Sequence, residues 1–158
     1  GEIDFYGNKK PEAPKSIVLY ARLMWTFSAV SNFFGDDQYI PYAETCKTFI
    51  EKYFLDPKNG GYFWEVSHNG EVLDTRKQVY AQAFVMYAYA ELYHATGDDR
   101  NLTRAMDVFY SLETRCADRE NGGYFEAFTQ DWKLHDDSRI TECAPNVPKG
   151  VSTHMHIV

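Results

Sequence analysis

The chain has 158 residues, of which 44% are hydrophobic and 16% aromatic, a composition that supports one packed domain and excludes a disordered segment. Its formal net charge of −7 argues against nucleic acid or an anionic membrane surface as a partner, because either requires a basic patch. The many Tyr and Phe residues suit stacking on sugars, although a large helical core also uses aromatic side chains.

The cysteines and the apolar segments predict the compartment. Cys46, Cys116 and Cys143 form no close motif and cannot all pair, which is typical of a reducing compartment, so we predict a cytoplasmic protein with structural thiols. Arg22 and Glu91 interrupt the two most apolar segments, which predicts that neither spans a membrane.

The first half of the chain reads as two helices followed by a turn. Residues 16–34 are apolar almost all round, which predicts a helix buried on every side and ended by Gly35. Residues 41–54 begin with proline and carry apolar residues three and four apart, as an amphipathic helix does. A glycine turn at 59–61 then leads into a short strand or hairpin at 62–66.

The same pattern then repeats. Residues 76–95 are again nearly all apolar and residues 101–116 are again amphipathic, and an Asn-Gly-Gly-Tyr-Phe turn follows. Gly35 and Gly97 are 62 residues apart (97 − 35), and so are Asn59 and Asn121 (121 − 59). This constant separation predicts an internal repeat. Residues 2–3 resemble the end of an earlier hairpin and residues 149–158 the start of another apolar helix, so we expect a repeat array truncated at both ends.

Helix pairs with one fully apolar and one amphipathic member predict an all-α toroid with inner and outer helices. We expect about two and a half helix pairs over residues 1–158, with short β-hairpins in the rim loops. A partial ring exposes inner-helix surface, so we also expect the 158-residue chain by itself to self-associate.

Several polar residues interrupt the apolar helices. Arg22 is the one charge within residues 16–34, and we expect it to face the central cavity or to find an internal partner. Tyr80 and Gln82 lie near the start of the second apolar helix and must form hydrogen bonds. His154 and His156 are two residues apart and point to different faces of a helix; we expect one to face the cavity as an acid/base or hydrogen-bonding group and the other to pack against a neighbouring helix. No set of residues has metal-ligand spacing, so no metal is expected.

Two alternatives remain open from the residues alone. Glu65, Glu126 and Asp131 in the predicted hairpins include a candidate carboxylate pair for glycoside hydrolysis, although acids beside glycines usually form turns. The aromatic faces also allow a helical interaction module without catalysis, which predicts a large exposed apolar patch.

Five motifs carry a resemblance to a known family: ARLMWTFS at 21–28, GGYFW at 60–64, KQVYAQAF at 77–84, NGGYFEA at 121–127 and THMH at 153–156. They resemble the N-acylglucosamine 2-epimerase superfamily, and most closely its cellobiose 2-epimerases, over essentially the whole chain. The resemblance implies an (α/α)6 barrel, of which this chain is a part. It also implies C2 epimerization of the reducing-end glucose of β-1,4-linked disaccharides (cellobiose, lactose) through a cis-enediolate, with no metal or other cofactor.

The resemblance also implies roles for residues at the matching positions. Arg22 and His156 are implied as catalytic residues, and substrate binding is assigned to Tyr80, Ser152, Trp25 and Gln82. Ser152 stands where the family motif has Asn, a shorter hydroxyl in place of an amide. The two proton-transferring histidines of the family match positions beyond Val158, which predicts that this chain alone is inactive. N-acylglucosamine 2-epimerase and mannose isomerase activities are the alternatives within the superfamily.

Overall fold

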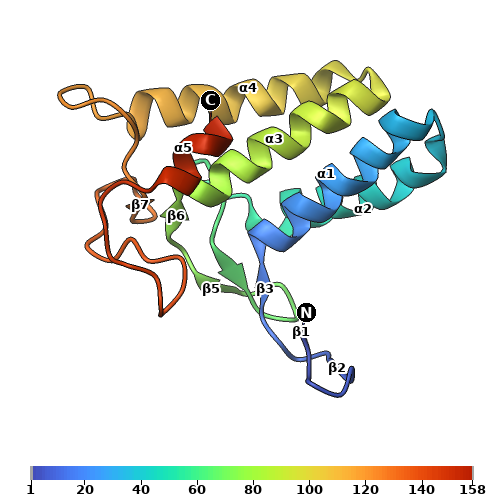
Figure 1. Ribbon diagram of the computed structural model, residues 1–158, viewed down its shortest axis with the longest axis horizontal. Helices are drawn as coiled ribbons and strands as arrows, with labels where there is room; N and C mark the ends of the chain where they lie inside the picture. Colours follow the sequence, from blue (N-terminus) through green and yellow to red (C-terminus); the bar gives the residue numbers. More distant parts are fainter. Residues whose placement is uncertain (1, 158) are drawn as a thin grey trace.

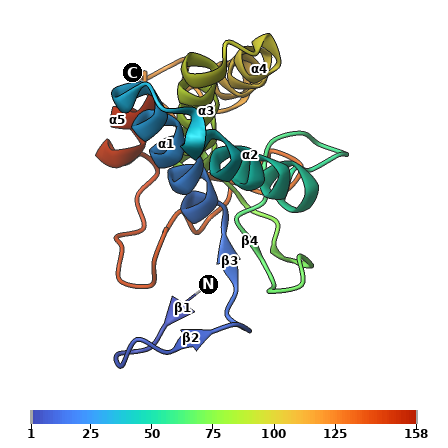
Figure 2. The same ribbon diagram turned by 90° about the vertical axis from the view of Figure 1, so that its right-hand side faces the viewer.

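The computed structural model describes residues 2–157 and contains two layers of packed helices (Figure 1). α1 (Ile17–Phe34), α3 (Val79–Thr96) and α5 (Val151–Ile157) follow one another in the inner layer, with α3 packed against both α1 and α5. α2 (Ile40–Phe49) packs on α1 and α4 (Asp99–Arg115) packs on α3 as the outer layer (Figure 2). The predicted pairs of inner and outer helices are confirmed.

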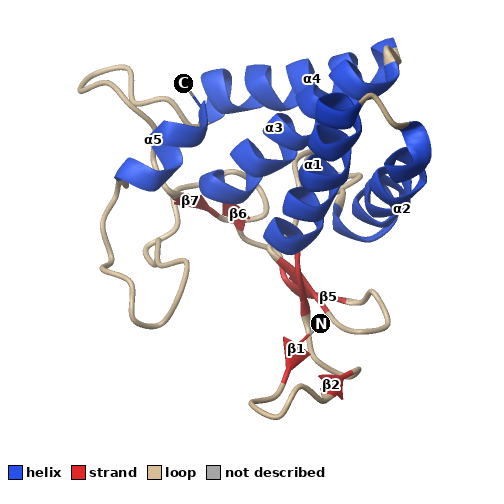
Figure 3. Cartoon of the chain, turned by 45° about the vertical axis from the view of Figure 1, so that its right-hand side comes forward, coloured by secondary structure: helices blue, strands red, loops and turns tan. Residues whose placement is uncertain are grey.

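Short antiparallel strands gather at one end of the helices (Figure 3). They form three small sheets in the orders β1-β2, β3-β4-β5 and β6-β7. Strands β3 and β6 lead directly into α1 and α3, so each sheet sets where an inner helix begins. The strands are β1 (Glu2–Ile3), β2 (Lys9–Lys10), β3 (Lys15–Ser16), β4 (Glu65–Val66), β5 (Val72–Asp74), β6 (Lys77–Gln78) and β7 (Ala127–Phe128).

The internal repeat is confirmed element by element. α1 and α3 both have 18 residues, and they start at Ile17 and Val79, which again gives the offset of 62 (79 − 17). Strands β4 and β7 have the same offset (127 − 65), as do the isolated bridges Leu55–Tyr62 and Ala117–Tyr124.

Each helix limit differs from the sequence prediction by at most two residues except at two places. The second inner helix starts at Val79 rather than at 76, because Lys77 and Gln78 pair with β7 as strand β6. The first outer helix is preceded by a 3-10 turn, η1 (Asp37–Tyr39), and its last part is the wider π-helical turn η2 (Ile50–Phe54).

Helix α1 is buried on one side rather than all round. Leu19 and Leu23 are 39% and 37% exposed, whereas its buried residues are spaced four and three apart: Ile17, Ala21, Met24, Ser28 and Ser31. α1 packs mainly on α2 and α3, whereas α3 packs on α1, α4 and α5 and is far more buried. By length and mean hydropathy (1.2) α1 could also cross a membrane, although core helices of soluble proteins share these properties.

Two of the three cysteines fit the prediction of structural thiols. Cys46 and Cys116 are buried between the layers, and burial raises the pKa of Cys116 to about 12. Cys143 is exposed, because it lies in the long loop before α5 rather than in a helix.

A buried ion pair ties the turn after α2 to the start of α3. The Lys77 ammonium lies 2.9 Å from the Asp56 carboxylate, and their side chains are 0% and 1% exposed. Burial alone would raise the pKa of Asp56, but hydrogen bonds from Lys77 and from the backbone N–H groups of Asn59 and Lys58 outweigh it and hold this pKa well below its usual range. Asp56 is therefore a charged anchor inside the protein.

The next copy of the repeat has the same pair with a longer loop. The sequence separation of Lys149 and Asp118 is 31, whereas that of Lys77 and Asp56 is 21. The second copy thus has ten more residues between the two partners of the ion pair, and these lie in the loop between β7 and α5. There the backbone N–H of Ser138 donates to the side-chain oxygen of Asn146, and its hydroxyl donates to the carbonyl of Val147. The side-chain amide of Gln78 donates to the carbonyls of Ser138 and Arg139, which pins the loop to β6.

The hairpin tips reveal a strained residue. Gly7, Gly70 and Trp132 occupy the same position in three hairpins, and each donates its backbone N–H to the carbonyl three residues earlier. Their φ angles are 85°, 90° and 64°, and Trp132 is the one non-glycine residue with positive φ among residues 2–157. Its indole N–H donates to the carbonyl of Asn59 at 2.9 Å, which links this hairpin to the previous glycine turn.

We expect Lys77→Met to lower the free energy of unfolding by about 3–5 kcal/mol, because Asp56 stays buried without its cation. The matched control is Lys133→Met, which breaks a Lys–Asp pair whose side chains are 78% and 52% exposed and should cost at most about 1 kcal/mol. Urea denaturation measures both. The lowered pKa of Asp56 adds stability that is present above the ordinary carboxyl pKa and is lost as the pH falls through the lowered value. Equal losses in the two variants would contradict this role of the buried pair.

At Trp132 we expect the glycine variant to be more stable than the alanine variant by about 1 kcal/mol, because both lose the ring but only glycine adopts the positive φ freely. The comparison at neighbouring Lys133, whose φ is not positive, should give the opposite order. Denaturant midpoints of the four variants test this, and the same order at both positions would disprove the strain.

Candidate functional site

One position on the three inner helices carries an arginine, a phenylalanine and a histidine in turn. Arg22 on α1, Phe84 on α3 and His156 on α5 differ in numbering by 62 and by 72 (84 − 22 and 156 − 84), as do the starts of these helices (79 − 17 and 151 − 79). The Arg22 guanidinium lies 5.1 Å from the centre of the Phe84 ring, and the imidazole of His156 lies 4.3 Å from it. The Phe84 ring therefore contacts a cation and an imidazole.

Arg22 is available to a ligand. It is exposed, and no carboxylate lies within ion-pair distance of it among the described residues. Its contact with the Phe84 ring restrains the guanidinium without using its N–H donors. A guanidinium in this state can donate to hydroxyl or anionic oxygens of a bound molecule.

The hydrogen bonding of His156 leaves one ring nitrogen unused. Nδ1 lies 2.7 Å from the carbonyl oxygen of Ser152. A carbonyl only accepts, so we assign the proton of the neutral ring to Nδ1. Nε2 then carries a lone pair and has no partner within the described residues, so it can accept a hydrogen bond or a proton from a ligand.

Tyr80 and Ser152 lie one helical turn before Phe84 and His156 and also occupy equivalent positions (152 − 80). The Tyr80 ring lies 5.5 Å from that of His156. Both residues line a cavity of about 350 Å³ whose other wall is apolar and comes from the long loop before α5. That wall is formed by Ile140, Ala144, Pro145 and Val147.

Trp25 lies three residues after Arg22 on α1. Its ring stacks on Tyr87 of α3, with 5.3 Å between the ring centres and 15° between the planes. Its buried indole N–H has no partner within residues 2–157. Trp25 thus extends the aromatic surface beside Arg22.

Gln82 is corrected from a substrate contact to a structural residue. It is 1% exposed, and its amide accepts from the backbone N–H of Tyr62 at 2.9 Å and donates to the carbonyl of Tyr62 at 2.8 Å. It therefore lies within the core and holds the first glycine turn. The residue at the equivalent position of α5 is His154 (154 − 82), which binds the second glycine turn rather than packing on a neighbouring helix as predicted.

The carboxylates proposed for glycoside hydrolysis are used within the fold. Glu126 is 6% exposed and accepts from the backbone N–H of Gly150 and from the hydroxyl of Thr153, so it caps the start of α5. Glu65 lies in the central strand of a small sheet, and Asp131 forms an exposed ion pair with Lys133. Burial, with a smaller contribution from Asp74, raises the pKa of Glu65.

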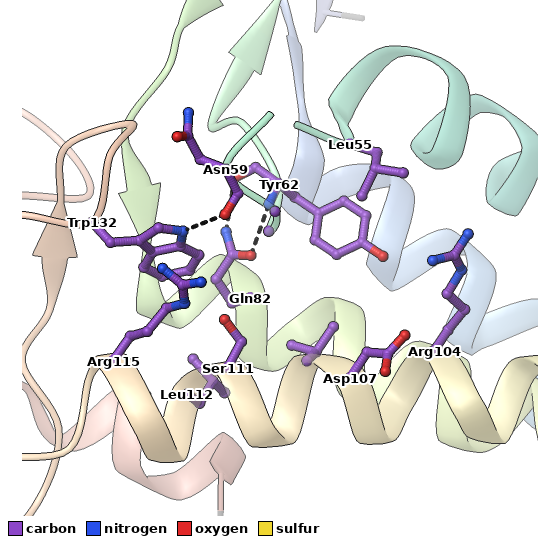
Figure 4. A pocket seen from close by; sticks show the side chains of 13 residues that line it. Leu55, Asn59, Tyr62, Gln82, Arg104, Asp107, Ser111, Leu112, Arg115 and Trp132 are labelled. Atoms are coloured by element: carbon purple, nitrogen blue, oxygen red, sulfur yellow. Dashed lines mark hydrogen bonds between the residues drawn. The ribbon is translucent and has the colours of Figure 1, made fainter. Parts of the chain in front are cut away.

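A separate pocket of about 210 Å³ lies between α4 and the first glycine turn (Figure 4). Figure 4 shows Arg104, Asp107 and Arg115 lining it from α4, opposite Tyr62 and Trp132. Of the predicted site residues it contains only the buried Gln82, so this pocket is distinct from the Arg22–His156 surface.

The arrangement around Phe84 combines a free guanidinium, an unpaired imidazole nitrogen, a phenol and a hydroxyl. These groups suit a polyhydroxylated ligand on which negative charge develops at oxygen. Within residues 2–157 no three His, Cys, Asp or Glu side chains are grouped to hold a metal ion.

Phe84 was missed by the sequence prediction. It could have been found by applying the repeat offset to Arg22, but an apolar residue within an apolar helix gives no signal of its own. The cap that Glu126 forms on α5 was also missed, because its partners Gly150 and Thr153 lie 24 and 27 residues away.

Comparison with known proteins gives a consistent result. The family model of N-acylglucosamine 2-epimerase matches residues 1–147. A cellobiose 2-epimerase of Bacteroides fragilis is 37% identical over 148 residues, which are 94% of this chain and 38% of that protein. The chain thus spans less than two fifths of the length of this relative.

Solved structures confirm the fold as part of an (α/α)6 barrel. The cellobiose 2-epimerase of Spirochaeta thermophila is 37% identical with a TM-score of 0.86, over 95% of this chain and 38% of that one. The enzyme from Bacillus thermoamylovorans is 29% identical with a TM-score of 0.92, over 99% and 40%.

We expect Glu126→Gln to destabilise the protein by about 1–3 kcal/mol, because an amide nitrogen would face the N–H or hydroxyl donor that now meets a carboxylate oxygen. Glu65→Gln is the contrasting variant. Since the pKa of Glu65 is raised, its charged form disfavours folding as the pH rises through that pKa, and removing the charge should be neutral or stabilising at pH 7. Thermal unfolding at pH 7 compares them, and a larger loss for Glu65→Gln would contradict the assignment.

Proposed function

The chain belongs to the N-acylglucosamine 2-epimerase family, and we propose that the whole protein is a sugar 2-epimerase that acts as the cellobiose 2-epimerases do. The reaction is reversible epimerization at C2 of the reducing-end glucose of a β-1,4-linked disaccharide such as cellobiose or lactose. No cofactor is needed for this proposal, because the chemistry is proton transfer at carbon.

The observation that carries the proposal is the contact of Arg22 and His156 with one Phe84 ring. These two residues match family motifs that lie near opposite ends of the chain. Packing of α1, α3 and α5 brings them to one surface together with Tyr80.

In the proposed reaction the sugar ring opens and the C2 proton is removed, which leaves an enediolate. Arg22 donates hydrogen bonds to the enediolate oxygens, where negative charge develops. His156 accepts a hydrogen bond from a substrate hydroxyl through Nε2, and the phenol of Tyr80 is a further hydrogen-bonding group. Trp25 and Ser152 complete the substrate contacts, with the Ser152 hydroxyl replacing the longer amide of the family motif.

The catalytic step needs residues from outside this chain. By the family resemblance, the two histidines that remove and return the C2 proton lie beyond residue 158. We therefore propose that residues 1–158 alone bind sugar weakly and do not catalyse the reaction.

Two related activities are the alternatives within the family. N-acylglucosamine 2-epimerase and mannose isomerase would use the same inner-helix arginine. The Arg-Leu-x-Trp-Thr-Phe-Ser form of the first motif and the names of the relatives favour the disaccharide substrate. A glycosidase is disfavoured, because Glu126 and Asp131 are bound to other residues of the chain.

Location and self-association are also proposals. The unpaired cysteines favour the cytoplasm. The exposed apolar residues of α1 and α5, among them Leu23, Val151 and Met155, favour association of the 158-residue chain when it is prepared alone. They would equally serve a non-catalytic interaction module, but such a module does not require the free Arg22 and His156.

The test is hydrogen exchange at C2 in the whole protein. With cellobiose or lactose in deuterium oxide, we expect deuterium at C2 by proton NMR and the mannose epimer by chromatography. Arg22→Met should lower kcat by about 100-fold or more, because a donor to the charged intermediate is lost. The matched control is Arg115→Met, which removes another exposed arginine stacked on an aromatic ring, 5.1 Å from Trp132, and should change kcat by less than about 2-fold. Absence of exchange with both sugars would refute the substrate assignment.

A further inference from the structure

His154 joins α5 to the second glycine turn. Its Nε2 accepts the backbone N–H of Tyr124 at 2.9 Å, and its Nδ1 lies 2.7 Å from the carbonyl oxygen of Gly150. The approach is so close that a Cβ on Gly123 would lie 2.4 Å from Nε2. This contact therefore requires a glycine at position 123.

The previous copy of the repeat makes the same contact with a different residue. Gln82 is equivalent to His154, and its side-chain oxygen accepts the N–H of Tyr62, also at 2.9 Å. In both copies an acceptor on the first turn of an inner helix binds the tyrosine N–H of an Asn-Gly-Gly-Tyr-Phe turn. The acceptor position is thus required by the repeat, while its chemistry differs between copies.

The partners define the protonation of His154. Nε2 faces an N–H donor and must carry a lone pair, whereas Nδ1 faces a carbonyl and must carry the hydrogen. A second proton would have to be added at Nε2, where it would oppose the Tyr124 N–H. The link therefore forms only while Nε2 carries no proton. An amide such as Gln82 has no second proton to gain and keeps its acceptor.

The link bears on His156, because His154 and His156 lie two residues apart in the first two turns of α5. Glu126 and His154 hold the first helical turn of α5 against the second glycine turn. His156 lies two residues after His154, half a helical turn further on. The contacts of His156 with Tyr80 and Phe84 therefore depend on how α5 is held at its start.

We propose that His154 is a positioning residue: its neutral imidazole fixes α5 on the Asn121–Phe125 turn and thereby sets His156 against Phe84 and Tyr80. The expected effect on kcat rests on the proposed function, whereas the positioning of His156 by His154 does not depend on it. The titratable and charged groups around His154 are the Lys149–Asp118 pair, Glu126 beneath the first turn of α5, Glu113 of α4 bonded to the Tyr124 hydroxyl, Tyr80 of α3, and His156.

The experiment compares His154→Gln and His154→Ala in the whole protein. Gln restores the acceptor used at position 82, so we expect kcat for cellobiose within about 3-fold of wild type at pH 7.5, whereas Ala lowers kcat about 10-fold or more. His94→Gln is the matched control, since His94 is an exposed histidine at the end of α3 and its replacement should leave kcat unchanged.

A spectroscopic measurement separates this proposal from the proposed function. In proton–nitrogen spectra of protein labelled at histidine, His154 should show the Nδ1–H tautomer, and the signals of His156 should shift in His154→Ala but not in His154→Gln. An Nε2–H tautomer of His154, or unchanged His156 signals in His154→Ala, overturns the positioning role. The positioning role is likewise overturned if His154→Ala only lowers the heat stability and keeps the wild-type kcat. If the wild-type protein epimerizes no sugar, the proposed function fails while these spectra still decide the role of His154.

Discussion

The structure depends on a charged pair that is buried from solvent. Asp56 and Lys77 attract each other across 2.9 Å with almost no exposed surface, and Asp118 and Lys149 repeat the pair in the next copy. Removing charges from water is costly, so such a pair is useful mainly because it admits one geometry. That geometry joins the turn after each outer helix to the residues just before the next inner helix, which form strand β6 in the first of the two copies. The inner helices therefore start at fixed places, and residues in their first two turns are brought into register.

Once the inner helices are in register, equivalent positions can hold different chemistry. Arg22, Phe84 and His156 share one position and supply a cation, an aromatic ring and a hydrogen-bond acceptor. Gln82 and His154 share another position and keep one role with different side chains. A repeat that is regular in its backbone thus builds a surface that is irregular in its chemistry.

The sequence predicted the elements, the internal repeat and the surface around Arg22, Tyr80 and His156, because periodicity and glycine turns are local signals. It could not predict contacts between distant residues. Gln82 reads as a polar group that needs a partner, but only the folded chain shows that the partner is the backbone of Tyr62. Trp132 gives no hint in the sequence of its positive φ, and the exposed side of α1 follows from the number of helices packed around it rather than from its composition.

The long loop before α5 shows how such a scaffold tolerates change. Ten residues are added between two anchor points, yet Lys149 and His154 bind partners equivalent to those that Lys77 and Gln82 bind in the shorter copy. Insertions there alter the apolar wall beside Tyr80 and Ser152 without moving the helices. During evolution, segments of this kind can be lengthened or exchanged one at a time, so that relatives can diverge in what they accept while the barrel stays the same.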